Sequence, residues 1–454
     1  MPAVPSEQSE EALASISSPF DEDPPLRSKT PPLSPEILQH QKQNFIILSL
    51  YQIFLRIGRV FKTDSVIMPA FLDFVMPAGW LRGCLPMLNR FGQSVPPLLF
   101  SGYLKRLPRK RNALMFTTLG MAIPFYLLGI LVLIYSKTSP GWMSLVFLIL
   151  YTVFFSLTGL SQLCYGTVQG KLVQTTRYGR LVTFSTLGGA IPAVLAAWWL
   201  MPGWLTTHPG LAFENLFFWT ATLFLVSGLL ALFLFEPAQE VNEEEEEEIE
   251  KPWSEVWRLA RFDKSFRKFI PLAMIYSSII ILFPHYQALG HERFTWDDAF
   301  FSEQLMIWVV VQNLSAGLVS VFIGPLGDRR GNRLALRMIF FLAMLGPLLA
   351  LYWVQHPQTG EGLYWTVFAI LGLTPVGVRL LYNYTLEIGP AEEHPHYLSA
   401  TGLCLAVPLG FSPIVGLLID ALGFEIIFLC GSALIGGGGF LTFRLDDPRR
   451  ESPG

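Results

Sequence analysis

Charge is scarce in this sequence. Only 15% of its 454 residues are Asp, Glu, Lys or Arg, whereas 52% are hydrophobic. Soluble domains usually contain about 25% charged residues, so the deficit excludes an ordinary soluble protein and indicates that lipid surrounds much of the chain. The net charge of −3 predicts no partner, because most negative charge lies in the N-terminal tail and in a glutamate run at 243–248.

Cysteine and histidine are also few, and the motifs of common enzymes are missing. No Walker A loop, HExxH, GxSxG or Rossmann glycine fingerprint is present. The basic clusters do not form a nucleic-acid footprint. We therefore expect no enzyme, cofactor, metal site or nucleic-acid partner. The four cysteines lie in or beside apolar stretches without CxxC spacing, which argues against disulfides and zinc: Cys84, Cys164, Cys404 and Cys430.

Long apolar segments fill the chain between residues 44 and 443. About 20 apolar residues are needed for a helix to cross the hydrocarbon of a bilayer. Twelve segments meet this condition, and we predict an all-α polytopic membrane protein. They are 44–75, 80–104, 112–136, 141–167, 179–202, 213–235, 268–289, 299–324, 333–354, 363–387, 397–421 and 424–443.

The segments group as six plus six. An acidic, Ser/Pro-rich tail at 1–43 lacks a signal-peptide core and is expected to be disordered and cytosolic. Six-helix bundles are expected at 44–235 and 268–443, and a short cytosolic tail at 444–454. Between them, the linker 236–267 carries the glutamates and a stretch that alternates aromatic and basic residues. This stretch suits a helix on the membrane surface, with a binding role as the alternative.

Basic residues gather on alternate connections between the predicted spans. Residues 105–111 hold five and residues 327–337 hold four, whereas the opposite connections hold only Arg82, Lys137 and Arg293. The positive-inside rule places the basic connections and both termini in the cytosol. An even number of spans requires the same side for both termini. We expect a multi-pass protein of the inner (cytoplasmic) or plasma membrane.

The two halves resemble each other in sequence. Residues 98–116 can be aligned with 321–340, with Gly102 matching Gly324, and a second alignment matches Tyr178 with Tyr397. The two offsets, 222 and 219 residues, are nearly equal. Two six-helix pseudo-repeats are typical of carriers that work by alternating access, in which the halves rock about a site at their interface.

One cytoplasmic loop carries a recognisable motif. The stretch from Gly324 to Arg333 resembles the G-x-x-x-D-R-x-G-R-R motif of the major facilitator superfamily, with Asn332 as the departure. The resemblance covers about 44–443 and implies a twelve-helix transporter fold. It also implies that these residues help to close the inward gate. The matching residues are Gly324, Asp328, Arg329, Gly331 and Arg333.

The first-half copy of the motif is degraded. Gly102 remains, but Arg106 stands where the family has aspartate and Arg109 replaces the second glycine. This departure puts in doubt whether the first-half gate works as it does in the family, and it leaves open whether transport is retained.

Four arginines lie inside predicted spans. Arg56 is about twelve residues into the first span, roughly 18 Å at 1.5 Å per residue, which is near the bilayer midplane. Arg59 shares its helix face. Arg90 lies near the middle of the second span and Arg379 in the inner half of the tenth. The family resemblance implies that these three helices line one central cavity. Guanidinium groups there would bind an anion.

A structural interpretation of these arginines stays open. Arg56 or Arg59 could pair with Asp64 or Asp73, and Arg379 with Glu387. Five further side chains are candidates for hydrogen bonds to substrate, although bonds between helices would explain them equally well: Gln162, Gln169, Gln312, Asn313 and Asn383.

Four carboxylates could carry a coupling proton: Asp64, Asp73, Glu303 and Glu387. Glu303 and Glu387 could instead sit at helix ends, where a charge costs little. His285, near the outer end of the seventh span, is expected at a wet interface.

The sequence thus predicts a secondary active transporter, a symporter or antiporter, that moves a small solute by alternating access. The arginines favour an organic anion, driven by an ion such as a proton or Na⁺ or by exchange. Its partners would be this substrate and the lipid bilayer, and we expect a monomer, as is common in the family. The alternative is a membrane sensor, receptor or assembly partner that keeps the fold without transporting.

Overall fold

A computed structural model describes residues 34–105, 107–135, 138, 140–174, 177–205, 209–238, 252–390 and 393–447. The predicted disordered tail up to residue 33, the glutamate run and the last seven residues lie outside the described residues. Residues 34–43, assigned to the tail from sequence, form a short helix and the start of the next one.

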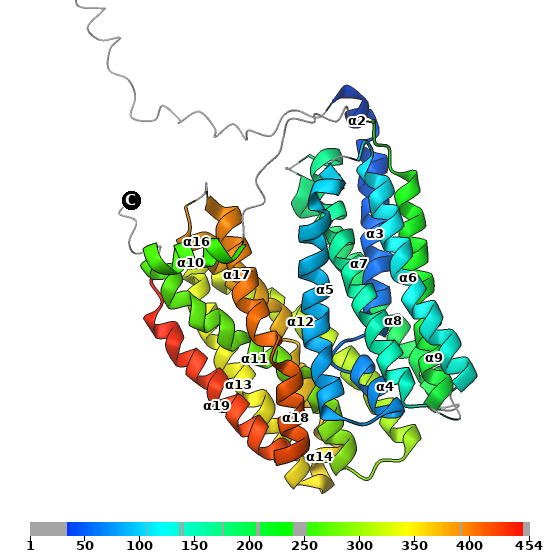
Figure 1. The fold of residues 1–454 in the computed structure, drawn as a ribbon, viewed down its shortest axis with the longest axis vertical. Helices are drawn as coiled ribbons and strands as arrows, with labels where there is room; N and C mark the ends of the chain where they lie inside the picture. The colour runs from blue at the N-terminus through cyan, green and yellow to red at the C-terminus, as the bar shows by residue number, and fades with distance from the viewer. Residues whose placement is uncertain are drawn as a thin grey trace, which may run out of the picture.

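The first half of the chain is mainly helical (Figure 1). Its elements are α2 (Pro35–Gln39), α3 (Gln41–Phe61), α4 (Ile67–Val75), α5 (Gly79–Lys105), α6 (Lys110–Tyr135), α7 (Trp142–Leu172), α8 (Tyr178–Leu205), α9 (Pro209–Leu230) and η2 (Ala231–Phe233).

The second half follows the same pattern after a short connecting helix, α10. Its elements are α10 (Pro252–Phe262), α11 (Lys264–Arg293), α12 (Asp298–Arg330), α13 (Asn332–Gln355), α14 (Pro357–Leu363), α15 (Trp365–Leu371), α16 (Thr374–Ile388), α17 (His394–Leu409), α18 (Ser412–Leu422), α19 (Phe424–Leu441) and η4 (Thr442–Arg444).

The all-helical fold class is confirmed. The described residues contain no strand, and 11 helical segments among them are long and apolar enough to cross a membrane. The predicted span that is missing from these 11 segments is the second one, at 80–104. It corresponds to α5, whose 27 residues would reach about 40 Å. Three prolines and the polar residues Arg82, Asn89 and Arg90 lower its hydropathy.

Three spans predicted as continuous are broken in the structure. Gly372 and Leu373 separate α15 from α16, and Gly410 and Phe411 separate α17 from α18. Proline follows each of these two breaks closely, and it cannot donate the backbone hydrogen bond that would continue a helix. The first span is broken at 62–66, between α3 and α4, where the backbone contains no proline or glycine.

The two ends of the molecule are packed differently. We call them the α14 end and the α10 end, after the short helices that lie there (Figure 1). One hydrophobic cluster runs through the first half and continues into the second half at the α14 end, where it includes Trp308 and Phe428. At the α10 end, the second half has a cluster of its own, which includes Phe266 and Phe340. The apolar core therefore joins the halves at the α14 end.

Close backbone contact between α5 and α18 reinforces this junction. A Cβ on Gly416 would lie 2.1 Å from the carbonyl oxygen of Gly79, and one on Gly83 would lie 2.5 Å from that of Ser412. Only small residues permit such an approach. The Asp420 carboxylate also accepts hydrogen bonds from the backbone N–H groups of Gly79 (2.7 Å) and Trp80 (3.2 Å). A negative charge is favourable at this helix N-terminus.

At the opposite end, α10 forms where the sequence suggested a surface helix. Leu259 is buried, while Trp257 and Phe262 are 79% and 77% exposed. Arg258 pairs with Glu393 at the start of α17, at 2.8 Å. These large exposed aromatics beside basic residues are typical of a helix at a membrane surface.

Candidate functional site

A cavity of about 450 Å³ lies between the two halves. This volume is within the range of pockets that hold small molecules. Residues from α3, α7 and α8 of the first half and from α12 and α16 of the second half contribute to its wall. The lining residues are Gln52, Arg56, Arg59, Val60, Tyr165, Gln169, Val182, Ser185, Thr186, Asn313 and Arg379.

Three of the four predicted arginines meet in this cavity. Arg56 and Arg59 are one turn apart on α3, and Arg379 approaches from α16. The positive charges of Arg379 and Arg59 both act on Arg56. Within the described part of the chain, none of these three guanidinium groups forms a hydrogen bond or an ion pair. The cavity wall therefore carries concentrated positive charge that the described residues do not neutralise.

The ion pairs considered from the sequence are not formed. Asp64 pairs with Lys62 and Asp73 pairs with Arg82, so neither carboxylate is bound to Arg56 or Arg59. Glu387 lies half-buried near the end of α16 without an ion pair to Arg379. Asp64 is nevertheless close enough to attract Arg59 electrostatically.

The remaining predicted binding residues occupy different places. Gln169 and Asn313 line the cavity, whereas Gln162 is exposed on α7. Arg90 lies outside its wall and donates to the carbonyl oxygen of Gly402 in the other half, at 2.5 Å. Gln312 accepts a hydrogen bond from Ser65 at 2.6 Å, and Asn383 is exposed on α16. Arg90 and Gln312 thus connect the halves beside the cavity.

Several lining residues were not predicted. Ser185 is buried at 7% exposure, and its hydroxyl has no hydrogen-bond partner in the part of the chain that the structure describes. Tyr165 stacks on Tyr51 with ring centroids 5.5 Å apart. Gln52 lies four residues before the predicted Arg56, and Tyr165 lies four residues before the predicted Gln169, so helical periodicity from these two residues would have found both.

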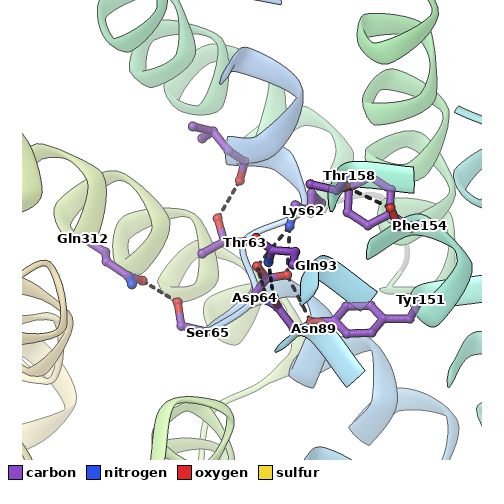
Figure 2. Close-up of polar contacts among 11 residues, drawn as sticks. Lys62, Thr63, Asp64, Ser65, Asn89, Gln93, Tyr151, Phe154, Thr158 and Gln312 are labelled. Atoms are coloured by element: carbon purple, nitrogen blue, oxygen red, sulfur yellow. Dashed lines mark hydrogen bonds and ion pairs between the residues drawn. The ribbon is translucent and has the colours of Figure 1, made fainter. Parts of the chain in front are cut away.

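The break in the first span holds a second polar cluster (Figure 2). The Lys62 ammonium lies 3.0 Å from both carboxylate oxygens of Asp64. Asp64 also accepts a hydrogen bond from Tyr151 of α7 at 3.2 Å and one from Asn89 of α5 at 3.4 Å. Residues from two other helices therefore hold the Asp64 side chain in the break between α3 and α4.

Lys62 is deeply buried for a charged residue. It is 5% exposed, and its ammonium lies 4.4 Å from the ring centroid of Phe155 and 5.0 Å from that of Phe154. Aromatic faces attract a cation. Lys62 was not among the predicted site residues, because its aromatic neighbours lie on a helix remote in sequence.

A third polar group lies at the α14 end. Asp73 on α4 pairs with Arg82 on α5 and accepts a hydrogen bond from Gln287 of α11 at 2.5 Å. The expectation for His285 was wrong: it is fully buried, and neither ring nitrogen has a hydrogen-bond partner among the described residues. Glu303, near the start of α12, is exposed.

The loop motif joins α12 to α13 at the α10 end. Gly331 has φ of 88°, a conformation that favours glycine. Arg333 donates to the carbonyl oxygens of Phe443 (2.9 Å) and Thr442 (3.3 Å) beyond the last helix. Arg329 is exposed. The Asp328 side chain is outside the described part of the structure. Gly102, from the first-half copy of the motif, lies within α5.

Solved transporter structures share this fold. A variant of the nucleoside transporter NupG has a TM-score of 0.64 and 14% identity, covering 90% of this chain and 100% of that one. A POT family transporter in complex with 5-aminolevulinic acid has a TM-score of 0.64, 14% identity and coverage of 90% and 97%. A bacterial homologue of the human lysosomal transporter Spinster, inward-facing and unoccupied, has a TM-score of 0.62, 13% identity and coverage of 91% and 99%.

At these identities the structural likeness shows the fold alone. No curated protein matches this chain significantly in sequence. The sequence profile of the Major Facilitator Superfamily, however, matches residues 85–404, which is more than half of the chain. The chain therefore belongs to the Major Facilitator Superfamily and is a multi-pass membrane protein, as the loop motif predicted.

Proposed function

We propose that this member of the Major Facilitator Superfamily is a secondary active transporter that carries a small organic anion by alternating access. The observation behind the proposal is the meeting of Arg56, Arg59 and Arg379 in one cavity between the halves. Placing a charge inside a bilayer costs at least about 2.5–3.5 kcal/mol, so three unpaired arginines need a compensating interaction. An anionic substrate provides one.

The chemistry of the wall supports an anion over other solutes. A guanidinium group matches the oxygens of a carboxylate or phosphate with two parallel hydrogen bonds. Among the described residues, the wall contains no carboxylate that could bind an amine or another cation. Gln52, Thr186 and Asn313 supply neutral hydrogen-bonding groups.

We place the α10 end in the cytosol, because the basic connections lie there and the positive-inside rule requires it. Both termini are then cytosolic, in an inner or plasma membrane. The apolar junction and the α5–α18 contact close the opposite, outer end. This conformation is therefore the inward-facing one, and the motif around Gly331 would contribute to the inner gate when that end closes.

Ligand-induced thermal stabilisation of the purified protein tests the proposed substrate class. The panel contains small carboxylates, phosphates, sugars, amino acids and cationic drugs. A ligand at 100 times its dissociation constant should stabilise the folded protein by about 2.7 kcal/mol. We expect carboxylate or phosphate hits that disappear in Arg56→Ala and Arg379→Ala.

Arg180→Ala is the matched control, because Arg180 is exposed on α8 and lies outside the cavity wall. Hits that persist in Arg56→Ala and Arg379→Ala, or hits confined to cations and neutral solutes, would contradict the anion site.

A further inference from the structure

The balance of charge around the cavity has a consequence for how transport is driven. Three arginines line the wall, and no aspartate or glutamate of the described chain does. The nearest carboxylate that attracts Arg59 is Asp64, and this group already holds the Lys62 ammonium between its two oxygens. Lys62 and Asp64 together add no net charge.

A coupling cation would need a carboxylate close to the substrate. At Asp64 that place is filled by the ammonium group of Lys62 (Figure 2). This group also lies over the rings of Phe154 and Phe155. Asp73 is likewise occupied, by Arg82, and it belongs to the α14 end. Neither carboxylate is available to Na⁺ in this arrangement, and the other two candidates, Glu303 and Glu387, are not part of the cavity wall.

Because no cation site lies beside them among the described residues, the three arginines control the movement between the state open at the α10 end and the state open at the α14 end. Closing the α10 end would seal the cavity from water while Arg56, Arg59 and Arg379 remain unpaired. Removing unpaired ions from water is strongly unfavourable, and an anion held by hydrogen bonds offsets the cost. The loaded cavity can therefore close, and the empty one is held open.

Resting on the proposed anion site, we infer that the protein is an obligatory anion exchanger. The empty carrier stays open at the α10 end, and only the anion-loaded carrier passes to the state that opens at the α14 end. Each crossing in one direction then requires an anion for the return.

Opening of the α14 end can be followed without knowing the substrate. Ser412 of α18 is fully buried against Gly83 of α5, so Ser412→Cys becomes reactive when these helices separate. The four native cysteines are replaced by alanine. The protein is placed in lipid nanodiscs without phosphate or carboxylate, and the rate of modification by a polar maleimide is measured. Met76→Cys, 38% exposed at the same end, reports the reagent's intrinsic rate.

The inference predicts slow modification of Cys at 412 in the parent protein. Removing the charges with Arg56→Gln, Arg59→Gln and Arg379→Gln together should accelerate it about tenfold or more, because the empty cavity can then close. Arg379→Gln alone should give a smaller increase, and it serves if the triple variant does not fold. Arg180→Gln removes an exposed charge that lies outside the cavity wall, so it should match the parent.

Equal rates in the parent and the charge-removed variants, whether fast or slow, would overturn the inference. That result would leave the anion site standing, because the ligand screen measures binding separately. Loss of all anion hits in the screen, with slow modification in the parent and acceleration in the variants, would contradict the substrate class instead.

Discussion

Arg56 on α3 and Arg379 on α16 line the same cavity from opposite halves of the molecule, and their positive charges repel each other. A bound anion would replace this repulsion with attraction to both. It would also link the two halves directly, which gives a substrate the means to influence how they move relative to each other.

Replacing Arg379 tests the contribution of this link. Hydrogen bonds to charged groups contribute about 1.5–3 kcal/mol, so Arg379→Ala should weaken anion binding about 10–100-fold. Arg379→Lys keeps the charge but loses the planar guanidinium group, so its affinity for the anion should lie between those of the wild-type protein and Arg379→Ala. Titration calorimetry with the best stabilising anion measures the affinities. Unchanged affinity in Arg379→Ala would show that α16 takes no part in binding.

Lys62 should be essential to stability because it neutralises Asp64 inside the membrane. Lys62→Met leaves Asp64 without its counter-ion and should reduce the free energy of unfolding by about 3–5 kcal/mol. Adding Asp64→Asn removes the unpaired charge and should restore much of the loss. Unfolding in a detergent titration compares the variants. A double variant no more stable than Lys62→Met would show that the pair is not the cause.

The contact between Gly79 and Gly416 should control closure at the α14 end. In Gly416→Ala the new methyl would meet the Gly79 carbonyl oxygen at 2.1 Å, so α5 and α18 must move apart. Such overpacking costs about 1–3 kcal/mol. Spin labels at Met76→Cys and Leu422→Cys should report a longer separation. Gly317→Ala, with no atom within 4 Å of the added Cβ, should leave the distance unchanged.

Within the loop motif, two glycines should respond differently to alanine. Gly331 has φ of 88°, where a side chain costs about 1–2 kcal/mol. Gly324 lies inside α12 with open space around it, so Gly324→Ala should be neutral or slightly stabilising. Thermal unfolding of both variants checks this contrast, and equal losses would mean that backbone strain is not what Gly331 relieves.

The length and apolarity of the segments were enough to predict the spans, because a bilayer requires a continuous apolar helix of fixed length. The break at 62–66 was not predictable in this way. Its polar groups are satisfied by Asn89, Tyr151 and Gln312, which lie on remote helices. Because these partners are far away in the sequence, the charges of Lys62 and Asp64 did not predict a break in the helix.

The candidate site was predictable in part. Charges inside spans singled out Arg56, Arg59 and Arg379, and the family resemblance implied that their helices meet. Arg90 was singled out on the same grounds, but it donates to a carbonyl oxygen 312 residues away. Ser185 gave no signal, since a serine in an apolar helix is common and only the fold shows it at the cavity.

Flux of the best stabilising anion into proteoliposomes tests the central claim most directly. We predict saturable uptake that requires wild-type Arg56 and Arg379, is abolished in Arg56→Ala and Arg379→Ala, and persists in Arg180→Ala. Binding without flux in the wild-type protein would contradict the carrier function and favour a sensor that keeps this fold. Flux that survives both cavity substitutions would show that the anion crosses by another route.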